Sequence, residues 1–547
     1  MKLSKRFLAL ALAGVMVLAL AACGGNGGSS APAPQSPASP APDAGSSTPE
    51  PAAPVEQILK YGTDTWPAGF DPHTISAIAA TRVFNQVYET LISFNPDMTY
   101  QGVLAESWET PDDTTYIFHL RKGVKFHNGR EMTADDVQYS FDRILGKTEA
   151  GDIGALGSSN SYYGGIDTIE VVDPATIKFT LKAPNAAFMS SLTSSYGAIV
   201  PKEVVEQNSG SLASIETMCG TGPFKYKDSV VDNYITLEKN ADYWEAGSPK
   251  LDGITYYLMA DESTRLAALR TGDINLCSLS ALNLADVQND SSIKVLSYQS
   301  NNYTYLGFNL SSQKLQDKNV RQAMSLAVDR DAIIDYVYNG EATVSTFVAP
   351  AMGHWVWDAP KESPLYKKNI EEAKKLMEAA GYSESNRMTL TVAAGLLDSI
   401  RDTAVILQQQ LKEIYIDVEI SNLESGEYVD IWGKMKTPEA GFDAMCGQNG
   451  SGTDPNRAVS FFFSSTGNAN VWGYKNDKVD ELCAQGVATT DEAQREKYYL
   501  EAQQIVIDEC PNLFFASPME YFFVSAGLEG FAPYAANAND FNNITLK

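Results

Sequence analysis

Apolar and polar side chains alternate along some segments of the chain and follow a helical period along others. Residues 115–120 place Tyr116, Phe118 and Leu120 at every second position, which predicts a strand with one buried face. The following apolar positions lie three or four residues apart, and Thr133 with Asp136 forms a capping box ahead of them, so a helix is expected to begin there. The inward side chains of these two elements are Tyr116, Phe118, Leu120, Val137, Phe141 and Ile144.

The alternating pattern and the helical pattern recur farther along the chain. Residues 177–181 read as a second strand, and helices are expected to open at Asp261 and Asp317. An apolar stripe over 404–414 runs directly into an alternating strand at 416–420. Strands and helices therefore alternate, which predicts a mixed α/β fold.

The amino terminus has a different pattern. A short basic start precedes a nearly uninterrupted apolar run from Phe7 to Leu20, which is too short to span a bilayer comfortably. The run ends in Leu20-Ala21-Ala22-Cys23, which resembles a bacterial lipobox, where the signal is cleaved ahead of a cysteine that carries a diacylglyceryl group. The alternative is an ordinary secretory signal with an unmodified Cys23. We expect a signal peptide at 1–22 and an extracytoplasmic lipoprotein anchored through Cys23.

The segment after Cys23 has almost nothing to bury. Residues 24–54 are rich in Gly, Ser, Ala and Pro, and such a composition is expected to form a disordered linker. Residues 55–547 are too many for one hydrophobic core, so two or three domains are expected. No second apolar stretch is long enough to cross a membrane. Membrane contact is therefore expected through the lipid alone.

Charge narrows the choice of partners. The full chain carries a formal charge of -27, and the signal peptide holds three basic residues and no acid, so the mature chain carries -27 - 3 = -30. Such a negative surface repels nucleic acid and anionic lipid. We expect a soluble folded body that binds neither.

Sequence motifs for catalysis and metal binding are missing. The five cysteines after Cys23 are an odd number and form no C-x-x-C pair, so we expect buried thiols, with one disulfide left open. The four histidines have no ligand spacing, and neither H-E-x-x-H nor G-x-S-x-G occurs. The sequence therefore predicts no enzyme, no metal and no cofactor. The cysteines are Cys219, Cys277, Cys446, Cys483 and Cys510; the histidines are His73, His119, His127 and His354.

Four long blocks match a known family in its own order. They are LAESWETPDDTTYIFHLRKGVKFHNGREMTADDVQYSFDRIL at 104–145, GTGPFKY at 220–226 with ADYWEAGSPKLDGITYYLMADESTRLAALRTGDIN at 241–275, YLGFNL at 305–310 with VRQAMSLAVDRDAII at 320–334, and EEAKKLMEAAGY at 371–382. Through them the chain, from about Tyr61 to its end, resembles the family 5 extracellular solute-binding proteins of ABC importers, the peptide, dipeptide and nickel class.

The resemblance implies a two-lobed periplasmic-binding-protein fold (type II, cluster C-like) with an additional domain beside the first lobe. Two hinge crossings are expected, near Ser300-Asn301 and near Cys510-Pro511. Ligand binds between the lobes, the lobes close on it, and a membrane permease reads the closed form. The implied division is lobe one at 55–98, 218–300 and 510–547, the additional domain at 99–217, and lobe two at 301–509.

Four segments are expected to line the cleft by the same resemblance: 63–66, 354–357, 394–398 and 447–457. Aromatic walls and a few aimed polar groups are typical of such sites. For each aromatic the alternative is a place in the core of its own lobe. The expected ligand-binding residues are Trp66, Tyr303, Trp355, Tyr428, Gln448, Asn449, Ser451 and Asp454.

The fourth segment departs from the dipeptide-binding pattern. Relatives often place an acidic residue at the position of Ser451, where it pairs with the free α-amino group of the ligand. A tryptophan often present nearby is replaced by Gln448. Asp454 is kept, although capping a turn ahead of Pro455 is an alternative role for it. These neutral side chains also fit sugars or modified peptides, and Arg401 is the nearest candidate for a ligand carboxylate.

The implied function is capture of a small solute, an oligopeptide or dipeptide first, and its delivery to an ABC permease. The protein is expected to be a monomer on the outer face of the cell membrane. The same fold could instead bind an oligosaccharide, a metal chelate or an opine. A nutrient-sensing receptor without transport is the remaining alternative.

Overall fold

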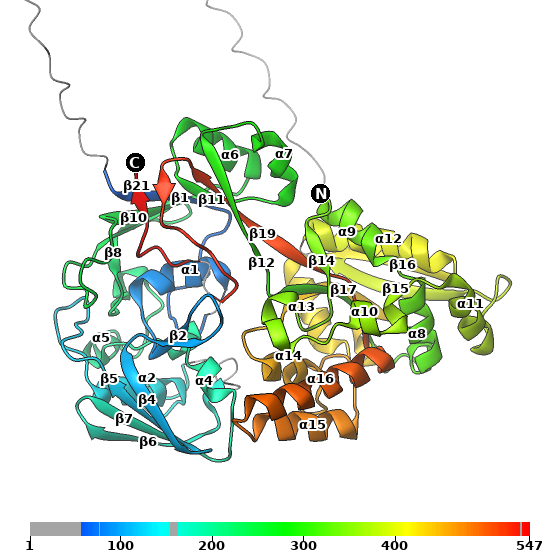
Figure 1. Cartoon of the computed structure of the whole chain (residues 1–547), viewed down its shortest axis with the longest axis horizontal. Helices are drawn as coiled ribbons and strands as arrows, with labels where there is room; N and C mark the ends of the chain where they lie inside the picture. Colours follow the sequence, from blue (N-terminus) through cyan, green and yellow to red (C-terminus); the bar gives the residue numbers. More distant parts are fainter. Residues whose placement is uncertain (1–55, 76, 154–161, 396, 537–538) are drawn as a thin grey trace, which may run out of the picture. The chain divides into compact units, whose positions relative to one another are not determined.

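The computed structural model describes residues 56–547, except 76, 154–161, 396 and 537–538 (Figure 1). The predicted signal peptide, Cys23 and the linker lie outside the described residues. Three large sheets, each with helices packed against it, confirm the mixed α/β fold. None of the helices in the described ranges has the length and apolar character that a membrane crossing requires.

Lobe one is built on an eight-stranded sheet in the order β12-β19-β11-β1-β10-β9-β8, with β14 added beside β19. Helix α6 (Glu262–Thr271) begins at the predicted cap, where Asp261 accepts a hydrogen bond from the Thr264 amide, and it ends at Gly272. The strands are β1 (Ile58–Thr63), β8 (Phe224–Val230), β9 (Tyr234–Lys239), β10 (Gly253–Leu258), β11 (Leu276–Ser278), β12 (Ile293–Gln299), β14 (Ala342–Val344) and β19 (Ala516–Ser525). The shorter elements of this lobe are α1 (Ile78–Val87), β2 (Ile92–Phe94), α7 (Leu284–Val287), β20 (Leu528–Glu529) and β21 (Thr545–Leu546).

The additional domain is a four-stranded antiparallel sheet in the order β4-β5-β7-β6. The predicted strand at 115–120 and the predicted helix after Thr133 are both present, and all six of their inward side chains are buried. The elements are β3 (Tyr100–Gly102), β4 (Ala105–Asp112), β5 (Thr115–Leu120), α2 (Ala134–Ile144), β6 (Ile166–Asp173), β7 (Thr176–Leu181), α4 (Phe188–Ser191) and α5 (Lys202–Gln207).

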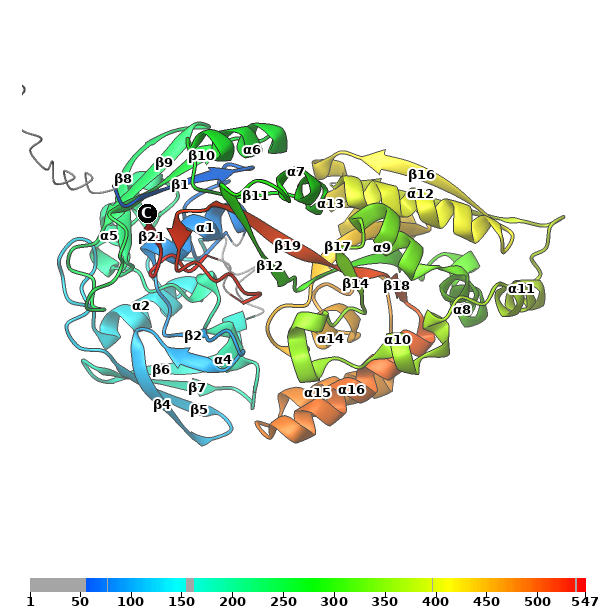
Figure 2. The ribbon, with the colours of Figure 1, turned by 45° about the horizontal axis from the view of Figure 1, so that its top comes forward.

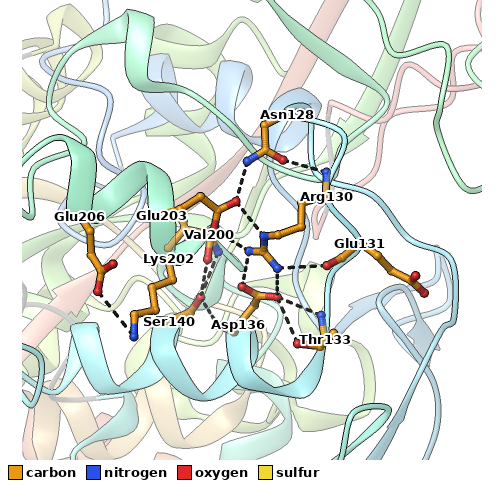
Figure 3. A network of polar contacts seen from close by, with 10 residues as sticks. All are labelled: Asn128, Arg130, Glu131, Thr133, Asp136, Ser140, Val200, Lys202, Glu203 and Glu206. Carbon is orange, nitrogen blue, oxygen red and sulfur yellow. Dashed lines mark hydrogen bonds and ion pairs between the residues drawn. The ribbon is translucent and has the colours of Figure 1, made fainter.

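A polar network in this domain is built around Arg130, which belongs to the sequence block at 104–145 (Figure 3). Arg130 donates to both carboxylate oxygens of Asp136, at 2.6 and 2.9 Å, and to both of Glu203, each at 2.8 Å. Asp136 also accepts from the Thr133 amide at 2.9 Å, which completes the predicted capping box. The turn before α2, the start of α2 and α5 are thereby held together by one guanidinium.

Lobe two is built on a five-stranded sheet in the order β16-β15-β17-β13-β18, with a hydrophobic core on each face. Figure 2 shows α15 and α16 running side by side, and these helices contribute to the core that contains Tyr303. The strands are β13 (Asn302–Phe308), β15 (Met388–Gly395), β16 (Ile416–Leu423), β17 (Ala444–Gly450) and β18 (Asn512–Phe514). The helices are α8 (Lys318–Ala327), α9 (Arg330–Tyr338), α10 (Ala359–Glu362), α11 (Ile370–Ala379), α12 (Asp398–Lys412), α13 (Ser425–Lys434), α14 (Pro455–Phe463), α15 (Asp477–Val487) and α16 (Glu492–Glu509).

Apart from β14, which pairs with the first residues of β19, the chain passes between the two sheets twice. The first passage, from β12 to β13, lies at Ser300-Asn301 as expected. The second lies later than the expected Cys510-Pro511, because β18 still pairs with β13 in the lobe-two sheet and the chain enters the other sheet only at Ala516. The hydroxyl of Ser517 donates to the Ser300 carbonyl at 3.0 Å, so the two passages are hydrogen-bonded to each other.

Gly307 lets the indole of Trp472 lie directly on β13. A Cβ at position 307 would stand 2.3 Å from two ring carbons of Trp472, which is fully buried. We expect Gly307→Ala to destabilise the protein by about 1–3 kcal/mol, because a packed core yields poorly to an added methyl group. Urea unfolding of the mature protein measures this. Gly426→Ala in α13 has open space around it and should be neutral or stabilising, by up to about 1 kcal/mol; an equal loss in both variants would contradict the prediction.

Candidate functional site

The segment 447–457 joins β17 to α14, and its local structure follows from its sequence. Asp454 is the N-cap of α14 and accepts a hydrogen bond from the Asn456 amide at 2.9 Å. Pro455 occupies the first helical position, where a missing N–H has no cost. The predicted capping role of Asp454 is confirmed.

Asp454 also forms a buried ion pair that sequence patterns did not reveal. Nη2 of Arg495, in α16, donates to both carboxylate oxygens at 2.9 and 3.0 Å, and the two side chains are 7% and 9% exposed. The guanidinium also lies 5.3 Å from the Trp355 ring centre and 5.7 Å from that of Tyr499. We call Asp454 and Arg495 the junction pair. Arg495 stands in no motif, so only the tertiary structure identifies it.

The junction pair lies where lobe two meets the additional domain. Burial, followed by the nearby Asp454 carboxylate, raises the pKa of Tyr100, which belongs to β3. Next to it the Ala186 amide donates to the Val487 carbonyl at 2.8 Å. Lobe two and the additional domain are therefore in contact on this side, with the ion pair close to the contact.

The two predicted amides, Gln448 and Asn449, lie on β17 opposite Thr304 and Tyr303 of β13. Neighbouring side chains of a strand point to opposite faces, so one segment of sequence serves two faces of the sheet. Asn449 shares the face of Tyr303 and hydrogen-bonds its hydroxyl, while burial raises the pKa of that phenol. Both amides are half-buried.

Two other predicted residues, Tyr303 and Tyr428, lie inside lobe two. Tyr303 is 1% exposed and packs against Phe462 and Phe514, and Tyr428 is 5% exposed and donates to the Cys446 carbonyl at 3.2 Å. Their visible role is in the core, and a ligand contact by either stays a prediction.

Ser451 is completely buried, and its hydroxyl closes a loop of its own lobe. It donates to the Phe347 carbonyl at 3.0 Å and accepts from the Ala349 amide at 2.8 Å. Both hydrogen-bonding roles of the hydroxyl are thus used within the protein. A direct contact between Ser451 and the ligand stays a prediction. In this geometry the Ser451 hydroxyl has a positioning role, because it holds a loop of its own lobe.

The two predicted tryptophans are half-buried and lie in different lobes. Trp66 follows β1 and lines a pocket with room for about one water, about 10 Å³, beside Arg82. Arg82 pairs with Asp64, also in the first predicted segment, at 3.1 Å. Trp355 packs edge-on against Tyr499, with ring centres 6.5 Å apart. Each tryptophan keeps an accessible part that a ligand could contact.

The predicted segment at 394–398 contributes little polar chemistry. Residue 396 lies outside the described residues. Arg401, the candidate for a ligand carboxylate, lies 3.4 Å from Asp398 in an exposed pair within α12. Its guanidinium is thus oriented along its own helix.

The described residues offer no metal centre and no reactive thiol. Among them, no group of three or more His, Cys, Asp or Glu side chains converges on a point that could hold a metal ion. All five cysteines that the structure describes are free, and burial raises the pKa of each thiol, to about 11 or 12. Burial likewise lowers the pKa of His73 and of His127 to about 4. At physiological pH the thiols are therefore protonated and the two imidazoles are neutral.

Known proteins resemble this chain along nearly all of its folded length. The oligopeptide-binding protein AppA of Bacillus subtilis is 30% identical over 476 residues, covering 83% of this chain and 84% of that relative. The solved structure of the periplasmic binding protein DppA from Helicobacter pylori, in complex with the peptide STSA, is 27% identical, covers 89% of this chain and 98% of its own, and has a TM-score of 0.76. The structure of AppA in complex with a nonapeptide is 27% identical, covers 90% of this chain and 99% of its own, and has a TM-score of 0.75.

A family model described as bacterial extracellular solute-binding proteins, family 5 Middle, matches residues 99–470. The match contains the additional domain and most of lobe two. Because it covers well over half of the chain, this protein belongs to the family 5 bacterial extracellular solute-binding proteins, and its function is to capture a solute for import by an ABC transporter.

Proposed function

We propose that the solute is a short peptide, held between the two lobes. The observation that carries this proposal is that solved relatives holding a tetrapeptide and a nonapeptide each match about nine-tenths of this chain. In peptide recognition of this kind, backbone hydrogen bonds supply affinity that does not depend on side chains. A site of that type needs few charged groups of its own.

We place the ligand against four half-buried side chains, Trp66 from lobe one and Trp355, Gln448 and Asn449 from lobe two. The tryptophans supply apolar walls and the amides supply neutral hydrogen bonds. The junction pair links Asp454, at the end of the 447–454 loop, to Arg495 in α16, and this ion pair holds the loop in place. Tyr303, Tyr428 and Ser451 lie in the interior of lobe two and support this surface.

The site should tolerate peptides without a free amino terminus. Ser451 stands where an acidic anchor is common, and its hydroxyl already bonds the backbone of Phe347 and Ala349. Losing one partner of a buried charge pair typically costs about 2–5 kcal/mol. Without that pair, we expect a peptide and its N-acetylated form to bind with affinities within about threefold of each other. Calorimetry with matched peptides tests this, and a hundredfold preference for the free amine would contradict it.

The decisive experiment for the ligand is mass spectrometry of material released from natively purified protein. Recovery of peptides supports the proposal, and recovery of sugars, metal chelates or opines alone overturns it. A thermal-shift panel is an independent readout, because a ligand that binds only the folded state raises the melting temperature. Mass spectrometry of each ligand after incubation with the protein tests for catalysis, since we expect every ligand to be recovered unchanged.

We further propose that the mature chain is a monomer tethered to the outer face of the membrane through lipid on Cys23. A tether keeps a binding protein at high effective concentration near its permease. Cys23→Ala should release the protein from the membrane fraction while leaving peptide affinity unchanged. Retention of this variant in the membrane would contradict the anchor. A strain that lacks the protein distinguishes transport from sensing. Loss of peptide import in that strain would show that the protein's role is not limited to sensing.

A further inference from the structure

A polar cavity of about 350 Å³ lies apart from the gap between the lobes. Its walls come from the end of α1, the β2–β3 hairpin, residues 243–245 and the C-terminal segment around Asp540. No residue between 301 and 509 lines it, so a movement of lobe two leaves its walls in place. Its volume falls within the range of about 300–1,000 Å³ that is usual for small-molecule sites.

The charge of this cavity is one-sided. Three carboxyl groups line it, those of Glu89, Glu245 and Asp540, and none of the described residues that line it is Lys, Arg or His. Glu89 is only 8% exposed, and it accepts hydrogen bonds from the Tyr243 hydroxyl at 2.8 Å and from the Trp244 indole at 3.1 Å. These donors hold the carboxyl group in one orientation without neutralising its charge.

The remaining lining suits a cation with an organic body. Aromatic residues, among them Tyr88, Phe94 and Tyr243, line the space, and cations are attracted to aromatic faces. The acidic groups do not converge as metal ligands do anywhere in the described part of the chain. A small bare metal ion is therefore a poor match.

We propose that this cavity binds a small organic cation, an ammonium compound of the size of choline or putrescine, independently of the solute between the lobes. The juxtaposition that carries the proposal is a buried, oriented carboxyl group, Glu89, in a polar cavity that two further carboxyl groups line, together with several aromatic residues. The proposal does not rest on the identity of the transported solute.

Binding should depend on pH in a defined direction. Burial raises the pKa of Glu89 to about 7, against the effect of its hydrogen-bond donors. The charged groups around it are Glu245, Asp540 near Tyr243, and Arg121, which stacks on the Trp244 ring. A cation favours the ionised carboxylate, whose fraction rises about tenfold between pH 6 and pH 8, so the affinity should rise about tenfold as well.

The test is isothermal titration of the mature protein with choline and with putrescine. We expect saturable binding of at least one compound, with about tenfold tighter binding at pH 8 than at pH 6. Glu89→Gln should abolish it, and Asp540→Asn, at a half-buried position, should weaken it if Glu89→Gln fails to fold. Glu106→Gln, at an exposed position outside the cavity, is the matched control and should bind as the wild type does.

Three outcomes would overturn the proposal. The first is no binding of either compound at millimolar concentration. The second is binding that survives both Glu89→Gln and Asp540→Asn. The third is competition between choline or putrescine and peptide for one site, which would place the cation between the lobes. Failure of the peptide hypothesis is distinguishable, because an Asp454 variant should affect peptide binding and leave cation binding intact.

Discussion

Replacing Asp71 with asparagine is expected to destabilise the protein by about 3–5 kcal/mol, the usual result of leaving a buried charge without its partner. Arg143 in α2 is fully buried, and its two terminal nitrogens donate to the two carboxylate oxygens of Asp71 at 2.5 and 3.0 Å. The pair joins the additional domain to the loop after β1 of lobe one. An asparagine keeps the shape and leaves the guanidinium charge uncompensated.

His73 cannot take over as the counter-charge. Its Nε2 lies 2.8 Å from the Ala198 carbonyl and its Nδ1 lies 2.8 Å from Arg143, so the ring is a neutral acceptor towards the guanidinium. Burial, followed by the charge of Arg143, lowers its pKa to about 4. At neutral pH the whole compensation for Arg143 therefore depends on Asp71.

Urea unfolding at several pH values measures the effect. Burial alone would raise the pKa of Asp71, but the hydrogen bonds from Arg143 hold it below the ordinary 3.8. Stability from a lowered pKa is present above the ordinary value and is lost as the pH falls through the folded-state value. The gap between wild type and Asp71→Asn should thus be full at pH 7 and shrink in strong acid. Lys202→Met, which breaks an exposed pair in α5, should cost less than about 0.5 kcal/mol; a similar cost in both variants would refute the assignment.

Replacing Asp454 is expected to have the second-largest effect, on both stability and peptide affinity. Asp454→Asn keeps an acceptor for the Asn456 amide but removes the charge that pairs with Arg495. We expect a loss of about 3 kcal/mol in unfolding free energy. Because the ion pair holds the 447–454 loop, peptide affinity should fall more than about tenfold. Asp454→Ala also removes the cap and should cost about 1 kcal/mol more.

A second aspartate provides the matched control. Asp491 caps α16 by accepting from the Gln494 amide at 3.1 Å, and it is exposed. Asp491→Asn keeps that cap, so it should change stability by less than about 0.5 kcal/mol and leave peptide affinity unchanged. Calorimetry and urea unfolding of the three variants separate capping from charge pairing. Equal costs for Asp454→Asn and Asp491→Asn would mean that the ion pair contributes nothing.

Local features of this protein could be predicted from the sequence because they depend on residues close together in the chain. The alternation at 115–120, the capping box at Thr133 and Asp136, and the caps Asp261 and Asp317 are all present as predicted. The long sequence blocks also identified the family. These features are determined within a few residues of the chain, so tertiary packing did not overrule them.

The candidate site was predicted only in outline. The 447–457 segment was identified, yet its residues separate in the structure: Gln448 and Asn449 face opposite sides of a strand, and Ser451 is buried against Phe347 and Ala349. One-dimensional patterns do not show which face of a sheet is covered. The second hinge lies later than the expected Cys510-Pro511. Pairing between strands that are distant in sequence decides where a lobe ends, and local patterns do not show it.

The sequence by itself determined the family, the fold class, the helix caps at Thr133, Asp261 and Asp317, and the absence of catalytic motifs. The tertiary structure alone decided which charges meet. Arg143 and Asp71 are 72 residues apart, and Arg495 and Asp454 are 41 apart. The cavity around Glu89 likewise forms only when α1, the β2–β3 hairpin and the C-terminal segment come together. Such partners depend on how whole elements pack, and a buried charge has a strong energetic effect only once packing has removed water from it.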